Sequence, residues 1–297
     1  MPPRPYVAHD QLIAPARRHP QLWRLGIGLV LIAAVSFGLN STLSALLMAW
    51  NASYWAAQFR SGLGNSPLPL LVMLGSFGFV TLGVFVAARL LQKRSGLSLL
   101  GPLWQTLRQF RRVLIALIAL GAVLALLPPY AIDPPLTKNL ALPMWLSLLP
   151  LSLMAVLVQA SAEEILFRGY IQQALAARFS NPLIWMILPS VLFALGHYLP
   201  TQAGDNAVPI AIWAGLFGIL MADLTARAGT LGPAIAVHLA NNVTALIVVS
   251  LPDSLSGLAL YVVAFDMADT EYLRNWLVVD FAMMFVTWLA ARLAIRR

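Results

Sequence analysis

The chain lacks cysteine entirely and has few charged residues. Without cysteine among its 297 residues it can form no disulfide, no thiolate metal site and no thiol nucleophile. Charged residues make up 10% of the chain, against about 25% in soluble domains. Apolar residues make up 60%, and the mean hydropathy is +0.80. These values exclude an ordinary soluble domain and predict an integral, multi-pass membrane protein in contact with the lipid bilayer.

The net charge of +8 would fit a nucleic-acid partner if the basic residues formed one patch. They instead flank apolar stretches, where the positive-inside rule places them, so we expect no nucleic-acid binding. Residues 1–22 are basic and proline-rich. This segment is long for the start of a signal peptide and no small-residue cleavage site follows, so we interpret it as a retained cytoplasmic tail.

A membrane-spanning helix needs roughly 20 apolar residues. The sequence predicts an all-α, polytopic membrane helical bundle of about eight such helices, at Arg24–Trp50, Leu68–Leu91, Val113–Tyr130, Met144–Ala177, Pro182–Leu199, Val208–Ala226, Leu231–Leu251 and Asn275–Ile295. A shorter run, Leu258–Phe265, is too brief to cross and is predicted to lie at the interface. The fourth stretch would be about 50 Å long if helical, so it must tilt, kink or project.

Charge placement predicts the orientation of these helices. With the N-terminus inside, the outside loops contain only Arg60, Lys138 and Arg274 among basic residues, and they also collect acidic residues (Asp133, Asp205, Asp253, Asp266, Asp269 and Glu271). This asymmetry places both termini in the cytoplasm. The expected location is the cell inner membrane.

Polar residues interrupt the fourth, fifth and seventh stretches. Two adjacent carboxylates, Glu163 and Glu164, are costly inside a membrane unless paired, solvated or used. Two of the four histidines, His197 and His238, also lie in apolar segments. At 1.5 Å per residue, Glu163 and His197 lie roughly 20 Å from the predicted cytoplasmic ends of their helices, and His238 and Asn242 roughly 10 and 16 Å. These groups can meet at one depth, which predicts a buried hydrolytic site.

Helical spacing separates the two glutamates. Glu164 and Arg168 are four residues apart in the favourable order for an ion pair, so we expect Glu164 mainly to hold the helix. Glu163 points elsewhere and is free to act on water as a general base. His238 and Asn242 are also four residues apart and share a face. Residue types alone supply a base, imidazoles and an amide donor without dividing the roles among them.

Three motifs carry a resemblance to a known family. Glu-Glu-x-x-x-Arg (Glu163, Glu164, Arg168), Phe-x-x-x-His (Phe193, His197) and His-x-x-x-Asn (His238, Asn242) occur in order within 80 residues. Together they resemble the CPBP family of intramembrane proteases, which includes type II CAAX prenyl endopeptidases and bacteriocin-immunity Abi proteins. Gly229-Thr230-Leu231 is similar to the family's lead-in to the last motif.

The resemblance implies a glutamate-dependent intramembrane endopeptidase acting on a protein or peptide substrate. Glu163 and His197 would activate water, and His238 and Asn242 would form the oxyanion hole. Glu164, Arg168 and Phe193 would give structural support. The chain then divides into a tail (1–22), N-terminal helices without a matched motif (23–143), a protease-like core (144–251), and an outside loop with the last helix (252–297).

Several alternatives stay open beside this interpretation. Glu163, His197 and His238 would make a zinc ligand set, but no His-Glu-x-x-His motif is present, and we favour hydrolysis without a metal or other cofactor. Ser161 lies in no nucleophile-elbow context. The chain could also be a non-catalytic immunity or scaffold protein. A proton-coupled transporter is a further alternative, because intramembrane Glu and His also form proton relays.

Overall fold

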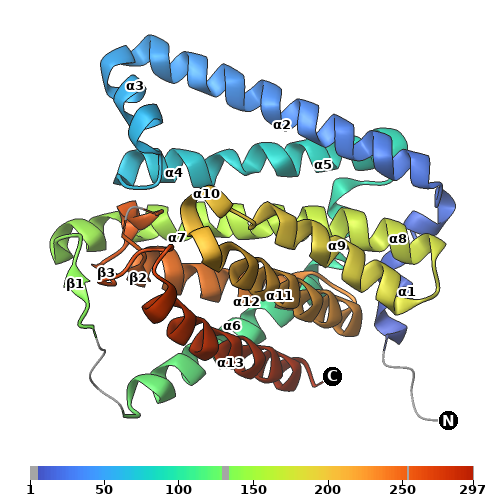
Figure 1. The fold of residues 1–297 in the computed structure, drawn as a ribbon. Helices are drawn as coiled ribbons and strands as arrows, with labels where there is room; N and C mark the ends of the chain where they lie inside the picture. Colours follow the sequence, from blue (N-terminus) through green and yellow to red (C-terminus); the bar gives the residue numbers. More distant parts are fainter. Residues whose placement is uncertain (1–5, 129–133, 253, 297) are drawn as a thin grey trace.

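The computed structural model describes residues 6–128, 134–252 and 254–296. Predicted features at Arg4, Tyr130, Asp133, Asp253 and Arg297 lie outside these ranges. Within them, almost all regular structure is helical, and the helices pack side by side as a bundle (Figure 1). The predicted all-α, polytopic fold is therefore confirmed, and the protein is an integral membrane protein.

Each predicted apolar stretch coincides with a helical segment. Five segments are long and apolar enough to cross a membrane: α2 (Leu22–Trp50), α4 with α5 (Pro67–Ser76 and Gly78–Leu91), α7 to α8 (Leu142–Arg178), α10 to α11 (Pro200–Ala228) and α13 (Thr270–Ile295). Two apolar segments are shorter, α9 (Pro182–Gly196) and α12 with η5 (Gly232–Val248), and α6 spans Leu103–Ala125. The short helices α1 (Val7–Ile13) and α3 (Ala52–Ser61) flank α2.

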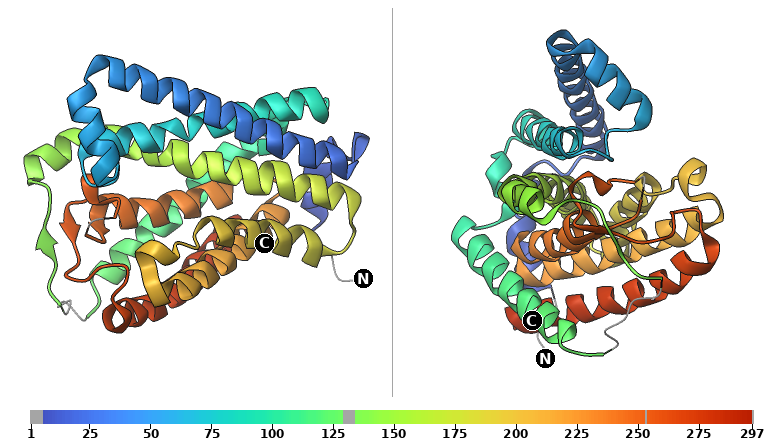
Figure 2. Two further views of the ribbon diagram at one scale, coloured as in Figure 1. Left: turned by 45° about the horizontal axis from the view of Figure 1, so that its top comes forward. Right: turned by 90° about the vertical axis from the view of Figure 1, so that its left-hand side faces the viewer.

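The bundle has an outer layer and a core. Helix α2 lies against α5 at one side of the molecule, as both views of Figure 2 show. Only 11% of its most apolar window is buried, against 50% for the α10–α11 segment. Helix α12 lies at the centre, between α6, α7 and α11, and every residue from Gly232 to Leu239 is buried. The core is thus built around the helix that carries the third motif.

The long fourth segment changes its helical winding where the first motif lies. Helix α7 (Leu142–Glu164) passes into a π-helical stretch, η3 (Ile165–Ile171), and continues as α8 (Gln172–Arg178). Helix α12 (Gly232–Val243) likewise passes into the π-helical η5 (Thr244–Val248) just after Asn242. Such π-helical insertions inside α-helices often occur at functional sites. The change to π-helical winding therefore falls within the first motif, between Glu164 and Arg168, and directly after the third.

Local signals fix the ends of the other core helices. Asn181 caps α9, accepting from the Leu183 N–H at 3.0 Å, and Pro182 follows at the first helical position. This helix ends at Gly196, earlier than the predicted Leu199, so His197 lies just beyond the helix. Gly229 (φ +70°) ends α11 in the left-handed conformation that glycine tolerates.

Helix α6 starts earlier than predicted. It begins at Leu103 rather than Val113, and in the polar turns before the apolar stretch one face, with Thr106 and Gln109, is buried in the core. Gln109 illustrates this: its amide donates to the Ala228 carbonyl at 3.3 Å, and its oxygen accepts from the Thr230 hydroxyl at 2.5 Å. A Cβ at Gly232 would collide with the Thr106 carbonyl oxygen, so glycine permits the close approach of α12 to α6.

A small sheet at one end of the bundle adds to the predicted all-α fold. It has the order β1–β3–β2, with β3 antiparallel to β1 and parallel to β2; the strands are β1 (Thr137–Lys138), β2 (Val249–Ser250) and β3 (Tyr261–Val262). The run predicted to be interfacial contains β3 and part of the 3₁₀ turn η6 (Ser256–Leu258). The orientation of the bundle in the membrane stays a prediction.

Candidate active site

Glu164 lies at the centre of a buried polar cluster. Its Oε1 accepts from Arg168 Nη1 at 3.1 Å, and both side chains are almost completely buried, so the predicted ion pair is present. Arg168 also donates to the Gly218 carbonyl at 3.2 Å, and its guanidinium lies 5.0 Å from the centre of the Phe193 ring. The same Glu164 oxygen lies 2.8 Å from His238 Nδ1, a contact that the spacing argument did not anticipate.

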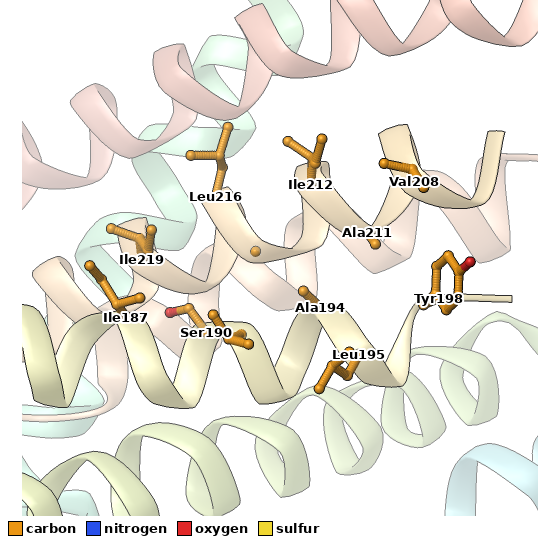
Figure 3. Close-up of a pocket in the computed structure, with 12 residues that line it drawn as sticks. Ile187, Ser190, Ala194, Leu195, Tyr198, Val208, Ala211, Ile212, Leu216 and Ile219 are labelled. Carbon is orange, nitrogen blue, oxygen red and sulfur yellow. The ribbon is translucent and has the colours of Figure 1, made fainter. Parts of the chain in front are cut away.

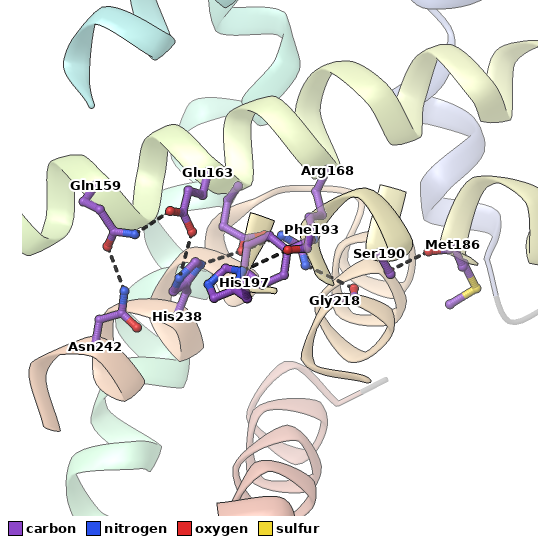
Figure 4. A network of polar contacts seen from close by, with 11 residues as sticks. Gln159, Glu163, Arg168, Met186, Ser190, Phe193, His197, Gly218, His238 and Asn242 are labelled. Carbon is purple, nitrogen blue, oxygen red and sulfur yellow. Dashed lines mark hydrogen bonds and ion pairs between the residues drawn. The ribbon is translucent and has the colours of Figure 1, made fainter. Parts of the chain in front are cut away.

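His238 lies between the two glutamates. Its Nδ1 faces Glu164 Oε1 at 2.8 Å, and its Nε2 faces Glu163 Oε2 at 3.4 Å (Figure 4). The rings of Phe193 and Phe217 meet the imidazole nearly edge-on, with centres 6.1 and 5.1 Å away. A carboxylate can only accept, so the short Nδ1 contact assigns a proton to Nδ1. The tautomer of His238 is thereby set by Glu164.

Glu163 is less buried than Glu164 and only partly engaged. Its side chain is 15% exposed, and its Oε1 accepts from Gln159 Nε2 at 2.7 Å. Its Oε2 is buried and has no hydrogen-bond partner among the described residues, although it lies 3.4 Å from His238 Nε2. A buried carboxylate oxygen with spare acceptor capacity is a place for a water molecule.

Asn242 reaches this cluster through a residue that the motifs omit. Its Nδ2 donates to Gln159 Oε1 at 2.7 Å, and its Oδ1 accepts from Asn241 Nδ2 at 3.1 Å. Gln159 therefore links Glu163 to Asn242 (Figure 4). The signal for Gln159 was available: it is an amide in an apolar run, four residues before Glu163 and so on the same face of α7.

His197 adjoins the cluster without a direct polar contact to it. Its Nδ1 lies 2.9 Å from the Phe193 carbonyl oxygen, and its ring lies against the Phe193 ring with centres 4.4 Å apart. Phe193 thus packs against both candidate histidines. In the part of the chain that the structure describes, His197 makes no hydrogen bond or ion pair with Glu163 or His238. Of the four predicted groups, Glu163, His238 and Asn242 therefore lie in one cluster. His197 lies beside this cluster, against the Phe193 ring.

The alternative zinc set does not assemble. Among the described residues, no three His, Asp or Glu side chains are arranged to hold a metal ion. Both nitrogens of His238 face carboxylates on opposite edges of the ring, so Glu163, Glu164 and His238 do not converge on one point. The residues present do not fit a zinc ion held by Glu163, His197 and His238.

An apolar groove runs along the adjacent face of α9. It lies between α9 and α11, encloses about 480 Å³, and is lined mainly by Ile187, Val191 and Leu195 on α9 and by Val208, Ile212 and Leu216 on α11 (Figure 3). Of the polar side chains in its wall, Ser190 is already bonded to the Met186 carbonyl at 2.7 Å. Phe193 lies on α9 and His197 directly follows this helix, and neither is among the residues that line the groove.

Comparisons with known proteins bear on this segment. Residues 144–244 match the family described as "Type II CAAX prenyl endopeptidase Rce1-like". The chain is also 28% identical over 189 residues to "Uncharacterized protein YyaK" of Bacillus subtilis, an alignment that covers 60% of this chain and 60% of that relative. No solved structure matches the chain significantly. The resemblance to the type II CAAX prenyl endopeptidases is therefore confirmed over residues 144–244, the segment that carries all three motifs.

Proposed function

We propose that this protein is an intramembrane, glutamate-dependent endopeptidase of the CAAX-protease type. One observation carries the proposal: Glu163 Oε2 is free of hydrogen-bond donors and lies 3.4 Å from the Nε2 of a buried histidine, within the segment that matches the protease family. Glu164 Oε2 also has no hydrogen-bond partner among the described residues, but Glu164 is completely buried, whereas the side chain of Glu163 is 15% exposed and can be reached by water. The core that performs the reaction is residues 144–251.

Glu163 and His197 are proposed to activate the attacking water. The Phe193 carbonyl can only accept, so the 2.9 Å contact assigns the proton of the neutral His197 ring to Nδ1 and leaves Nε2 as an acceptor. Glu163 Oε2 takes one proton from the water as its oxygen bonds to the scissile carbonyl carbon. The same proton then passes to the leaving nitrogen as the C–N bond breaks.

His238 and Asn242 are proposed to stabilise the oxyanion of the tetrahedral intermediate. One Asn242 amide hydrogen is directed at Gln159, and the second remains for the oxyanion. His238 Nδ1 donates to Glu164, so His238 Nε2 donates to an oxyanion only when the ring is doubly protonated. The two neighbouring carboxylates would balance that charge. Glu164 would then act through His238, in addition to its ion pair with Arg168.

The substrate is proposed to be membrane-associated. The groove between α9 and α11 is almost wholly apolar, and α9 also carries Phe193 and ends next to His197. A peptide anchored by an apolar segment or a prenyl group could therefore reach the site from the bilayer. Prenylated CAAX peptides are the first substrates to test, because the matched family is described by that activity.

Cleavage of prenylated and unprenylated CAAX peptides by the purified protein in proteoliposomes tests the proposal. The wild type should release the terminal tripeptide, and Glu163→Ala should not. Ser161→Ala is the matched control, since Ser161 lies two residues away on α7 and has no proposed role; it should retain activity. The proposal would be contradicted if the wild type cleaved none of the peptides. It would also be contradicted if Ser161→Ala lost activity while Glu163→Ala retained it.

Hydrolysis is proposed to need no metal ion. Exhaustive chelation should leave the rate unchanged, and elemental analysis should find no stoichiometric zinc. Recovery of one zinc per chain, with activity lost on its removal and restored on its return, would contradict this part of the mechanism.

A further inference from the structure

The polar groups at the site form a chain of hydrogen bonds with one direction. Asn241 Nδ2 donates to Asn242 Oδ1 at 3.1 Å, Asn242 Nδ2 to Gln159 Oε1 at 2.7 Å, and Gln159 Nε2 to Glu163 Oε1 at 2.7 Å. An amide can be turned end for end, but a carboxylate can only accept. Glu163 Oε1 therefore requires the NH₂ group of Gln159 as its donor. Gln159 then turns its oxygen toward Asn242, so Asn242 must present its own NH₂ group to Gln159.

This direction matters because it fixes two proposed catalytic groups at once. Glu163 Oε1 is occupied by Gln159, which leaves Oε2, the oxygen beside His238, to take a proton. Asn242 is held with its Nδ2 toward α7, so its remaining N–H is aimed by the same contact. Gln159 is 7% exposed and lies on α7, whereas Asn242 lies on α12, so the bridge also ties the two helices together at the site.

We infer that Gln159 is a positioning residue that aligns the base Glu163 with the oxyanion donor Asn242. The inference rests on the proposed function, because alignment has meaning only if these two groups act on one substrate. It adds a residue outside the three motifs, and it explains why a neutral amide stands in the apolar run one turn before the glutamates. A carboxylate there would repel Glu163, and an apolar side chain would leave Asn242 free to turn.

Gln159→Met tests the inference, since methionine keeps the approximate length and apolar environment while removing both hydrogen bonds. Misalignment of about 1 Å can cost about 10²-fold in rate, so kcat should fall roughly 10- to 100-fold with KM little changed. Gln172→Met is the matched control: Gln172 is a buried amide farther along the same helical segment, bonded to the Ala222 carbonyl at 3.3 Å, and its loss should leave kcat unchanged.

A double-mutant cycle separates positioning from a merely structural role. If Gln159 acts through Asn242, then Gln159→Met in an Asn242→Ala background should reduce kcat by clearly less than it does in the wild type. Equal factors in the two backgrounds, or an unchanged kcat in Gln159→Met, would overturn the inference. If Gln159→Met does not fold, as judged by its melting temperature in detergent, Gln159→Glu replaces it.

Gln159→Glu keeps an acceptor for Asn242 and places a like charge against Glu163. It should lower kcat at least as much as Gln159→Met, whereas near-normal turnover would overturn the inference. The cleavage assay distinguishes this failure from that of the proposed function. A wild type that cleaves while the Gln159 variants are unaffected refutes only the role of Gln159, whereas a wild type that cleaves nothing refutes both.

Discussion

Two carboxylates in this bundle have opposite surroundings. Asp223 on α11 is satisfied at both oxygens: Oδ1 accepts from the Tyr6 hydroxyl at 2.9 Å, Oδ2 from Trp288 Nε1 at 3.1 Å, and both from Arg227 Nε at 2.8 Å. This cluster joins α1, α11 and α13. Glu163 on α7 instead leaves Oε2 without a hydrogen bond and remains partly exposed.

The difference separates a group that holds the fold from a group suited to chemistry. A buried carboxylate with both oxygens hydrogen-bonded lowers the free energy of the folded state, but it has no oxygen free to accept a proton from water or a substrate. A carboxylate with one free oxygen beside a histidine gives up that stabilisation and can bind water. In the sequence both are acidic residues within apolar runs, and only the contacts in the structure distinguish them.

Glu163→Gln should have the largest effect on turnover and little effect on stability. The amide keeps the shape and loses basicity, so the cleavage rate should fall by about 10²–10⁴ while the melting temperature in detergent stays close to that of the wild type. Asp223→Asn is the matched comparison: it should lower stability by about 1–3 kcal/mol and keep the rate. Reversed outcomes for the two variants would reverse the comparison.

Glu164→Gln should be the most destabilising change at the site. Arg168 would remain buried without its carboxylate, and breaking a buried pair from one side costs roughly 3–5 kcal/mol. Thermal melts of Glu164→Gln and Glu163→Gln, made side by side in one detergent, measure the difference. A lower melting temperature for Glu163→Gln would show that the two glutamates have been assigned to the wrong roles.

Asn242→Ala should lower the cleavage rate by about 10²–10³ with KM little changed, because an oxyanion donor acts only in the transition state. Asn242→Asp should be at least as damaging, since an ionised carboxylate accepts and repels the forming oxyanion. Steady-state kinetics on one peptide measures both. Retention of most of the rate by Asn242→Ala would mean that Asn242 only joins helices.

The smallest expected effect is a local response of α1 to pH. His9 is buried between Gln172 (3.4 Å) and the Trp185 ring (4.5 Å between centres), and burial lowers the pKa of His9 from 6.5 to about 4; nearby Asp10 opposes this shift and Arg17 adds to it. A lowered histidine pKa means that the folded state holds the neutral ring. Its contribution is complete above pH 6.5 and is lost as pH falls from 6.5 toward 4.

Thiol labelling can measure this response, because the natural chain has no cysteine. In a Leu12→Cys background, where position 12 is buried, labelling should accelerate as pH falls through this window, after correction for the reactivity of the thiol itself. His9→Phe keeps an aromatic ring against Trp185 and cannot titrate, so its labelling should lose the pH dependence. Equal pH dependence in both proteins would contradict the assignment to His9.

Sequence reasoning found the parts of the site that follow from helical spacing and motifs. The Glu164–Arg168 pair is present because four-residue spacing places both side chains on one face of the helical segment. Asp223 and Arg227 pair for the same reason. The contact of Glu164 with His238 joins residues 74 positions apart. No local spacing predicts it, because it depends on how α7 and α12 pack.

The sequence by itself determined that this is a membrane bundle, where its apolar helices lie, and which polar residues carry the motifs. Composition and the pattern of apolar residues are sufficient for these predictions. Each membrane helix forms its backbone hydrogen bonds internally and exposes apolar side chains to lipid, so neither property depends on the other helices. Tertiary structure decided that Gln159 joins the site, that His197 lies just beyond the end of α9, and that Glu163 rather than Asp223 keeps a free oxygen. These depend on long-range packing around α12, where Gly232 lets α6 approach and two histidines share Phe193.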